Sequence, residues 1–194
     1  MMGLLSKRDF RQRQIRALEK INQTVKQKEE KIISKYLFNS NEWVQSKVVG
    51  ITLSQVHEFS TDALIQEAKK INKTIVIPRT YNDDERTMEF VRLDADTILE
   101  PKVFGILEPT NGIVYESDQI DLMLVPGVAF ESRDGFRVGF GAGYYDRYLA
   151  NFKGITMALA FEEQLFKLPE WKVNDFDVPI KIICSTGGLQ YATD

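Results

Sequence analysis

Cysteine is almost missing from this chain, which has Cys184 alone among its 194 residues. One cysteine cannot form an intramolecular disulfide, so the sequence excludes small crosslinked secreted domains and indicates a reducing compartment. The apolar neighbours Ile182 and Ile183 favour a buried structural thiol over a reactive one. Stability must therefore come from an apolar core, for which a chain that is 43% hydrophobic has enough material.

Long apolar runs are missing as well. No segment approaches the roughly 20 apolar residues of a membrane-spanning helix. The short apolar start at Leu4 and Leu5 is followed at once by Lys7, Arg8 and Arg11, which a secretory signal peptide would not tolerate. We therefore expect a cytoplasmic protein with no membrane partner.

The sequence contains no internal repeat, low-complexity tract or proline-rich linker, which predicts a single domain over residues 1–194. Glycine and proline are absent between Lys7 and Phe38, so this part is expected to form two helices with a break near Val25. The charge is uneven along the chain. Residues 1–35 contain ten Lys/Arg against four Asp/Glu, whereas the remainder contains fifteen against twenty-four. A basic N-terminal segment suits phosphate groups of a nucleotide or nucleic acid, and equally a solvated helix surface.

Strand-like and helix-like segments alternate after the N-terminal helices. The expected strands are 48–53, 74–77, 88–93, 122–125, 155–161 and 179–184, and the expected helices are 61–71 and 146–152. Pro78 is expected to end the second strand, and the continuous apolar run 122–125 is typical of a central strand. This alternation predicts an α/β fold, a three-layer sandwich with a mostly parallel central sheet and an N-terminal helical segment. Ligands of such sheets bind outside the carboxyl ends of the strands.

A glycine-rich loop follows one of these strands. Gly139, Gly141 and Gly143 alternate just after Arg137, and glycine lets backbone N–H groups approach phosphate oxygens. The loop does not end in the Gly-Lys-Ser/Thr of a Walker A motif, and Tyr144 stands where the dinucleotide fingerprint requires glycine. The glycine spacing alone is also compatible with a structural turn.

The loop and its surroundings resemble the signature of the 5-formyltetrahydrofolate cyclo-ligases. The matching loop features are Pro126-Gly127-Val128-Ala129-Phe130, Gly135, Arg137, Gly139, Gly141, Gly143 and Tyr144-Tyr145-Asp146-Arg147. Further features follow in family order: Lys7, Arg11, Leu53, Glu58, Thr61, Pro78-Arg79, Met88, Gly105-Ile106, Glu108-Pro109, Ala160-Phe161, Gln164, Pro169 and Asp175. The resemblance thus covers most of the chain.

This resemblance implies an enzyme that converts 5-formyltetrahydrofolate and ATP to 5,10-methenyltetrahydrofolate, ADP and phosphate, with Mg²⁺ as cofactor. In the implied mechanism the formyl oxygen attacks the γ-phosphate, N10 closes the ring and phosphate leaves. Such chemistry needs positioning and neutralisation of phosphate charge rather than a nucleophilic side chain. The expected partner is the formyl-folate, free or polyglutamylated, with no nucleic acid, and a monomer is expected.

The resemblance also assigns site residues. ATP would be bound by Lys7, Arg11, Arg137, Gly139, Phe140, Gly141, Ala142, Gly143, Tyr144 and Tyr145. Among these, the catalytic groups would be Arg137, Tyr144 and Tyr145. The folate would contact Leu53, Glu58, Met88 and Tyr144, with Glu58 accepting hydrogen bonds from the pterin. The metal would be held by Asp146 and Asp175.

These assignments have ordinary structural alternatives. Lys7 and Arg11 also fit an exposed helix face, Asp146 a helix N-cap, and Met88 a core position. Asp175 also fits an N-cap or a surface position, Glu58 an acid in the first turn of a helix, and one of Tyr144 and Tyr145 the core. The only histidine, His57, is given no catalytic role. The chain departs from the family where Phe140 and Ala142 replace basic loop residues of some members, and where Asn174 and Lys181 replace an expected histidine and aspartate.

Two rival functions stay open at the level of the sequence. One is a non-catalytic nucleotide- or RNA-binding protein that uses the basic N-terminal segment, although the aromatic interleaving of single-strand binders is absent. The other is a small-molecule kinase or a different ATP-dependent ligase on the same fold.

Overall fold

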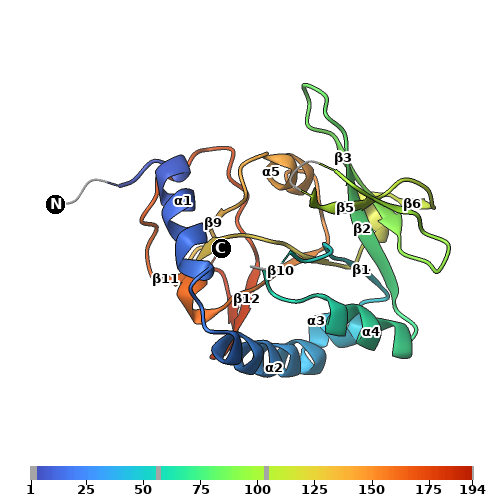
Figure 1. The fold of residues 1–194 in the computed structure, drawn as a ribbon, viewed down its shortest axis with the longest axis horizontal. Coiled ribbons are helices and arrows are strands. Elements are labelled where there is room, and N and C mark those ends of the chain that lie inside the picture. The colour runs from blue at the N-terminus through green and yellow to red at the C-terminus, as the bar shows by residue number, and fades with distance from the viewer. Residues whose placement is uncertain (1–3, 56–57, 103–104, 194) are drawn as a thin grey trace.

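A computed structural model describes residues 4–55, 58–102 and 105–193 (Figure 1). His57 lies outside these residues. The main sheet has eight strands in the order β13-β12-β10-β7-β1-β2-β3-β6. Their bounds are β1 Val48–Gly50, β2 Thr74–Thr80, β3 Met88–Arg92, β6 Val114–Tyr115, β7 Leu122–Leu124, β10 Ile155–Leu159, β12 Ile182–Ser185 and β13 Gly188–Tyr191. The run from β12 through β10, β7 and β1 to β2 is parallel, and the outer pairings are antiparallel. The expected α/β fold with a mostly parallel sheet is confirmed.

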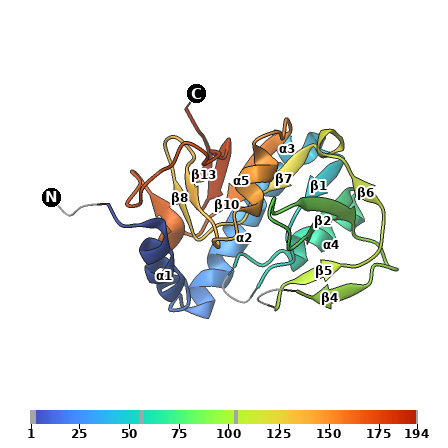
Figure 2. The ribbon, with the colours of Figure 1, turned by 90° about the horizontal axis from the view of Figure 1, so that it is seen from above.

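Both faces of the sheet are buried, as β7 illustrates. Successive side chains of a strand point to opposite faces. Leu122 and Leu124 pack in the core under α2 (Gln23–Asn39), α3 (Asn41–Gln45) and α4 (Asp62–Lys70), whereas Met123 packs under α5 (Tyr144–Leu149). Figures 1 and 2 show α2, α3 and α4 on one side of the sheet and α5 on the other.

The break between the two N-terminal helices spans residues 19–22, just before Val25, near which we expected it. The first, α1, is Lys7–Leu18, and α2 begins after Asn22. The Asn22 side chain accepts a hydrogen bond of 2.8 Å from the Thr24 N–H, so this asparagine is the N-cap that decides the boundary. Val25 therefore lies in the first turn of α2.

Pro78 does not end β2, contrary to our prediction. The Val76 carbonyl accepts a hydrogen bond from Ile51 N–H on the β1 side, so Pro78, two residues on, faces the same side. The register pairs β1 with β2 only as far as Gly50 and Val76, and the missing proline N–H therefore has no β1 partner to lose. β2 continues to Thr80 through its pairing with β3.

Smaller elements complete the fold. A three-stranded sheet, ordered β11-β8-β9, contains β8 (Ala129–Glu131), β9 (Arg137–Val138) and β11 (Leu165–Phe166), and a hairpin pairs β4 (Leu99–Pro101) with β5 (Leu107–Pro109). Among the described residues, 3-10 turns span Ser117–Gln119 and Glu162–Gln164. In the described part of the chain, no helix is long and apolar enough to cross a membrane.

The helix α1 packs against the small sheet rather than the large one. Phe10 is completely buried, with its ring centroid 4.9 Å from that of Trp171 and 5.3 Å from that of Phe166. Cys184 is also buried, and this burial raises the pKa of its thiol to about 12, as expected of a structural cysteine.

Candidate active site

The glycine loop, residues 139–143, lies between β9 and α5 and continues the chain that leaves the carboxyl end of β7. Two of its glycines have a backbone conformation that side chains disfavour, Gly141 with φ of 113° and Gly143 with φ of 79°. A Cβ on the third, Gly139, would lie 2.6 Å from Arg137 Nη1. The loop therefore keeps its backbone close to the Arg137 guanidinium.

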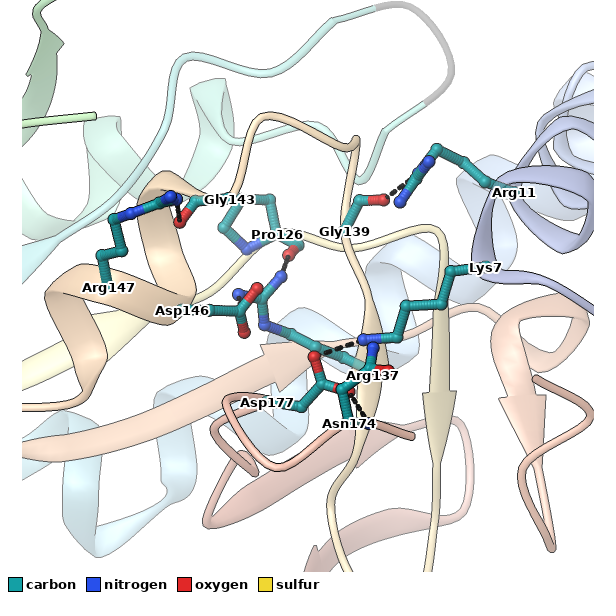
Figure 3. A network of polar contacts seen from close by, with 10 residues as sticks. All are labelled: Lys7, Arg11, Pro126, Arg137, Gly139, Gly143, Asp146, Arg147, Asn174 and Asp177. Carbon is teal, nitrogen blue, oxygen red and sulfur yellow. Dashed lines mark hydrogen bonds and ion pairs between the residues drawn. The ribbon is translucent and has the colours of Figure 1, made fainter. Parts of the chain in front are cut away.

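Arg137 forms the centre of a polar network (Figure 3). Its residue is only 5% exposed, yet Nη2 donates to Asp146 Oδ1 at 3.1 Å and Nη1 donates to the Pro126 carbonyl at 3.5 Å. Burial lowers the pKa of Arg137, and the nearby Asp146, Tyr145 and Asp177 oppose that shift. The Nε atom is buried with no hydrogen-bond partner among the described residues. A buried cation with a spare donor is suited to an incoming anion.

Two cations of α1 reach the same network. Arg11 Nε donates to the Gly139 carbonyl at 2.6 Å, and Lys7 Nζ forms an ion pair with Asp177, whose side chain is 4% exposed. Lys7 and Arg11 are one helical turn apart and so share a face of α1. These contacts exclude the alternative in which both cations lie on a solvated helix surface.

Two carboxylates face Arg137, but one differs from the expected pair. Asp146 is the third residue of α5, whose N-cap is Gly143, so its alternative as an N-cap is wrong. The second carboxylate is Asp177; Asp175, expected there from the resemblance, is exposed in a turn two residues earlier. The signal for Asp177 was present in its apolar surroundings, since Val178 and Ile180 follow it toward β12. The described residues contain no cluster of three or more His, Cys, Asp or Glu that could hold a metal by themselves.

A small cavity of about 50 Å³ adjoins this network and contains Glu58. Pro126 belongs both to the cavity wall and, through its carbonyl, to the Arg137 network. Glu58 Oε2 accepts a hydrogen bond of 2.7 Å from the Gln55 N–H. Burial raises the pKa of Glu58, although that hydrogen bond and the nearby Lys26 act in the opposite direction. The cavity therefore holds a carboxyl group that is costly to ionise unless a ligand binds it.

The two tyrosines after the loop differ in environment. Tyr144 hydroxyl donates to the Tyr81 carbonyl at 3.0 Å and so ties α5 to the β2–β3 hairpin. Tyr145 hydroxyl is buried with no hydrogen-bond partner among the described residues, and its ring centroid lies 5.7 Å from the Arg137 Cζ. Burial raises the pKa of Tyr145, which keeps the hydroxyl protonated as a donor.

The structure thus brings together most of the residues that the sequence pointed to. The network and loop contain Lys7, Arg11, Arg137, Gly139, Phe140, Gly141, Ala142, Gly143, Tyr145 and Asp146. Leu53 packs against the core under α2, outside the residues that line the cavity. Met88 is 8% exposed and packs in the core under α5, which agrees with the alternative that it is a core residue. Asp177 and the cavity residues Ser54 and Gln164 complete the site, and the sequence had not assigned them a role.

These features define an α/β enzyme with a cation-lined glycine loop at the carboxyl edge of its parallel strands. The chain belongs to the 5-formyltetrahydrofolate cyclo-ligase family, whose model matches residues 4–186. The resemblance noted in the sequence is confirmed, and the rival function of a non-catalytic binding protein is excluded.

Several relatives support this membership. The 5-formyltetrahydrofolate cyclo-ligase of Mus musculus is 32% identical over 191 residues, which covers 92% of this chain and 89% of the relative. That of Haemophilus influenzae is 32% identical over 157 residues, or 77% and 83% of the two chains. The solved structure of 5,10-methenyltetrahydrofolate synthetase from Aquifex aeolicus superposes with a TM-score of 0.83 at 25% identity, covering 97% of this chain and 93% of that one.

Proposed function

We propose that this enzyme closes the ring of 5-formyltetrahydrofolate in an ATP-dependent reaction that yields 5,10-methenyltetrahydrofolate, ADP and phosphate. The observation that carries the proposal is Arg137, a buried guanidinium with an unsatisfied Nε between the glycine loop and the Glu58 cavity. If ATP occupies the glycine loop and the folate occupies the Glu58 cavity, Arg137 lies where the phosphoryl group must meet the folate.

The chemistry balances without a nucleophilic side chain. An amide oxygen is a poor leaving group, so the formyl oxygen first attacks the γ-phosphorus and ADP leaves. N10 then attacks the activated formyl carbon, the N10 proton is lost, and the C–O bond breaks to release phosphate. The enzyme has to align the two ligands and neutralise the phosphoryl charge, which for transfers of this type supplies most of the catalysis.

The residues of the network divide these tasks. Arg137 would donate its fork of N–H groups to the transferring phosphoryl oxygens, while Lys7 and Arg11 would bind the rest of the triphosphate. Tyr145, protonated and without a partner, would donate to the formyl or phosphoryl oxygen. Glu58 would accept hydrogen bonds from the pterin in the cavity.

A divalent cation such as Mg²⁺ would neutralise charge on the phosphates when bound. The residues fit this ion, because Mg²⁺ commonly takes only one or two protein carboxylates together with phosphate and water oxygens. Asp146 would be the first carboxylate. Asp177, rather than the exposed Asp175, is the second candidate because it belongs to the network through its ion pair with Lys7.

Isotope transfer tests the proposed reaction. With ¹⁸O in the formyl group, Mg-ATP and purified protein, the phosphate released alongside methenyl-folate should carry one ¹⁸O atom, as read by mass spectrometry. Methenyl-folate formation without ATP, or phosphate that stays unlabelled, would contradict the phosphorylation step. ADP release with a different acid or amide and none with formyl-folate would favour the rival kinase or ligase.

Replacing Glu58 by glutamine should weaken folate binding and stabilise the unliganded protein at neutral pH. The KM for formyl-folate should rise about ten- to a hundredfold, because charged hydrogen bonds to the pterin are lost. A raised pKa means that the folded state binds the proton more tightly, so Glu58 costs stability as pH rises from its ordinary value of 4.5 through the raised value.

The stability part of this prediction has its own signature. The thermal midpoint of Glu58→Gln should exceed that of the wild type at pH 7, and the difference should vanish below about pH 4.5, where both side chains are neutral. Glu67→Gln, on the exposed face of α4, is the control and should leave KM unchanged. An unchanged KM in Glu58→Gln would remove Glu58 from the substrate site.

Asp177 and Asp175 give a matched pair of variants for the metal. Asp177→Asn should raise the Mg²⁺ concentration needed for half-maximal activity about tenfold, whereas Asp175→Asn should leave it unchanged. The Asn174 N–H donates to Asp177 Oδ2 at 2.7 Å, and an asparagine oxygen can still accept that bond, so the variant keeps this loop contact although it loses the ion pair with Lys7. The reverse pattern would restore Asp175 as the ligand expected from the sequence.

A further inference from the structure

Two exposed phenylalanines border the polar network. Of the phenylalanines that the structure describes, Phe140 and Phe176 alone are exposed, by 48% and 71%. Neither ring contacts another aromatic side chain in the described part of the chain. Exposed apolar residues are common singly, but a pair on two separate loops beside one site is a feature that calls for a ligand.

Both loops are attached to the same face of α1. Phe140 follows Gly139, whose carbonyl accepts the Arg11 hydrogen bond, and Phe176 precedes Asp177, the ion-pair partner of Lys7. Lys7 and Arg11 are one turn apart, so their Cβ atoms are roughly 5–6 Å from each other. Figure 3 shows Gly139 and Asp177 converging on these two cations from separate segments. The phenylalanines therefore adjoin the cations that the proposed function assigns to the triphosphate.

The protein leaves about half of Phe140 exposed, at 48%. Its neighbours Gly139 and Gly141 have no side chains, and a Cβ on Gly141 would lie 3.2 Å from the Arg11 Cζ, so the loop already packs closely on α1. A planar ring laid on the phenyl groups would remove apolar surface from water without displacing any protein contact.

We propose that Phe140 and Phe176 bind the purine ring of the nucleotide and so determine a large part of its affinity. This inference rests on the proposed function. The γ-phosphate has to face the formyl group near the Glu58 cavity, so the nucleoside end must lie on the other side of Arg137, toward α1. The pterin belongs to the cavity, and the purine is the planar ring that remains for the two phenylalanines.

Phe140 lies in the loop that the cations Arg137 and Arg11 border. A phenyl group adds no charge to the phosphate site, which leaves that task to Arg137, Lys7 and Arg11. The loop position would then contribute to recognition of the base. Aromatic rings suit this purpose because every nucleobase has a flat face on which they can stack.

Titration calorimetry with Mg-ATP and with magnesium tripolyphosphate separates the base from the phosphates. Phe140→Ala and Phe176→Ala should each raise the Kd for ATP about tenfold and leave the Kd for tripolyphosphate within about twofold of the wild type. Phe140→Trp should bind ATP at least as tightly as the wild type. Both positions are exposed, so these variants should keep their fold.

Tyr191→Ala is the matched control, because Tyr191 is an exposed aromatic (59%) whose hydroxyl donates to Glu42 of α3, outside the polar network. It should change neither Kd. Equal weakening of ATP and tripolyphosphate by the phenylalanine variants, or no weakening of ATP, would overturn the inference while leaving the phosphate site intact. Failure of the wild type to bind either ligand would instead overturn the proposed function together with the inference.

Discussion

Replacing Arg137 by methionine should lower kcat/KM for methenyl-folate formation about a thousandfold, the range seen when a buried charge-stabilising arginine is removed from a phosphoryl-transfer site. Methionine fills the space of the arginine stem but offers no donor. The phosphoryl oxygens would lose the guanidinium fork, and Asp146 would lose the partner that now lies 3.1 Å away. The rate of appearance of methenyl-folate absorbance measures the effect.

Arg137→Lys and Arg133→Met make the result specific. Lysine keeps the charge but not the planar fork, so it should recover only a small part of the rate. Arg133 is an exposed arginine in the turn between β8 and β9, and among the described residues its side chain pairs with the neighbouring Asp134. Arg133→Met should retain the wild-type rate. A folded Arg137→Met protein with near wild-type activity would remove the central residue from the proposed mechanism. Loss of one partner of a buried ion pair can lower the stability of a protein by about 3–5 kcal/mol. Circular dichroism therefore has to verify that Arg137→Met is folded.

The sequence predicted those parts of the fold and site that depend on local patterns. The continuous apolar run at β7 predicted a strand covered on both faces, and alternating glycines after Arg137 predicted a loop close to a cation. Both patterns have a direct physical cause within a few residues. The position of Lys7 and Arg11 on one face of α1 was also predictable, because residues four apart share a helix face.

Long-range contacts were not predictable in the same way. The apolar residues after Asp177 could have indicated that it is more buried than Asp175, but no local signal says that its partner is Lys7, near the other end of the chain. The extension of β2 through Pro78 depends on the length of the neighbouring strand β1, which the proline itself does not encode. The family resemblance gave the order of the site residues, but packing decided which of two nearby acids faces the network.

The position of Arg137 depends in turn on a tight junction behind it. Gly135 lies in the turn between β8 and β9, and its carbonyl accepts a hydrogen bond of 2.8 Å from the Ile180 N–H. This contact joins the β8–β9 turn to the segment that carries Asp177. The two halves of the polar network are therefore connected through backbone at a glycine, two residues before Arg137.

Gly135→Ala should lower the free energy of unfolding by about 4 kcal/mol, which is exceptional for so small a change. Gly135 has φ of 82°, and an added Cβ would lie 2.1 Å from the Ile180 carbonyl oxygen, so the backbone itself would have to move. Gly105→Ala is the control with φ of 74° and nothing within 4 Å of the new Cβ, and it should cost only the conformational strain of about 1–2 kcal/mol.

Urea unfolding of the two variants separates crowding from backbone strain. An equal decrease in the free energy of unfolding of Gly135→Ala and Gly105→Ala would mean that the positive φ accounts for the whole effect. The backbone at Ile180 would then move away from the new Cβ at little cost. A much larger loss in Gly135→Ala would mean that the junction is rigid. In that case the remaining folded protein should also show a lowered kcat, because any shift that relieves the contact moves β9 and, with it, the guanidinium on which the proposed phosphoryl transfer depends.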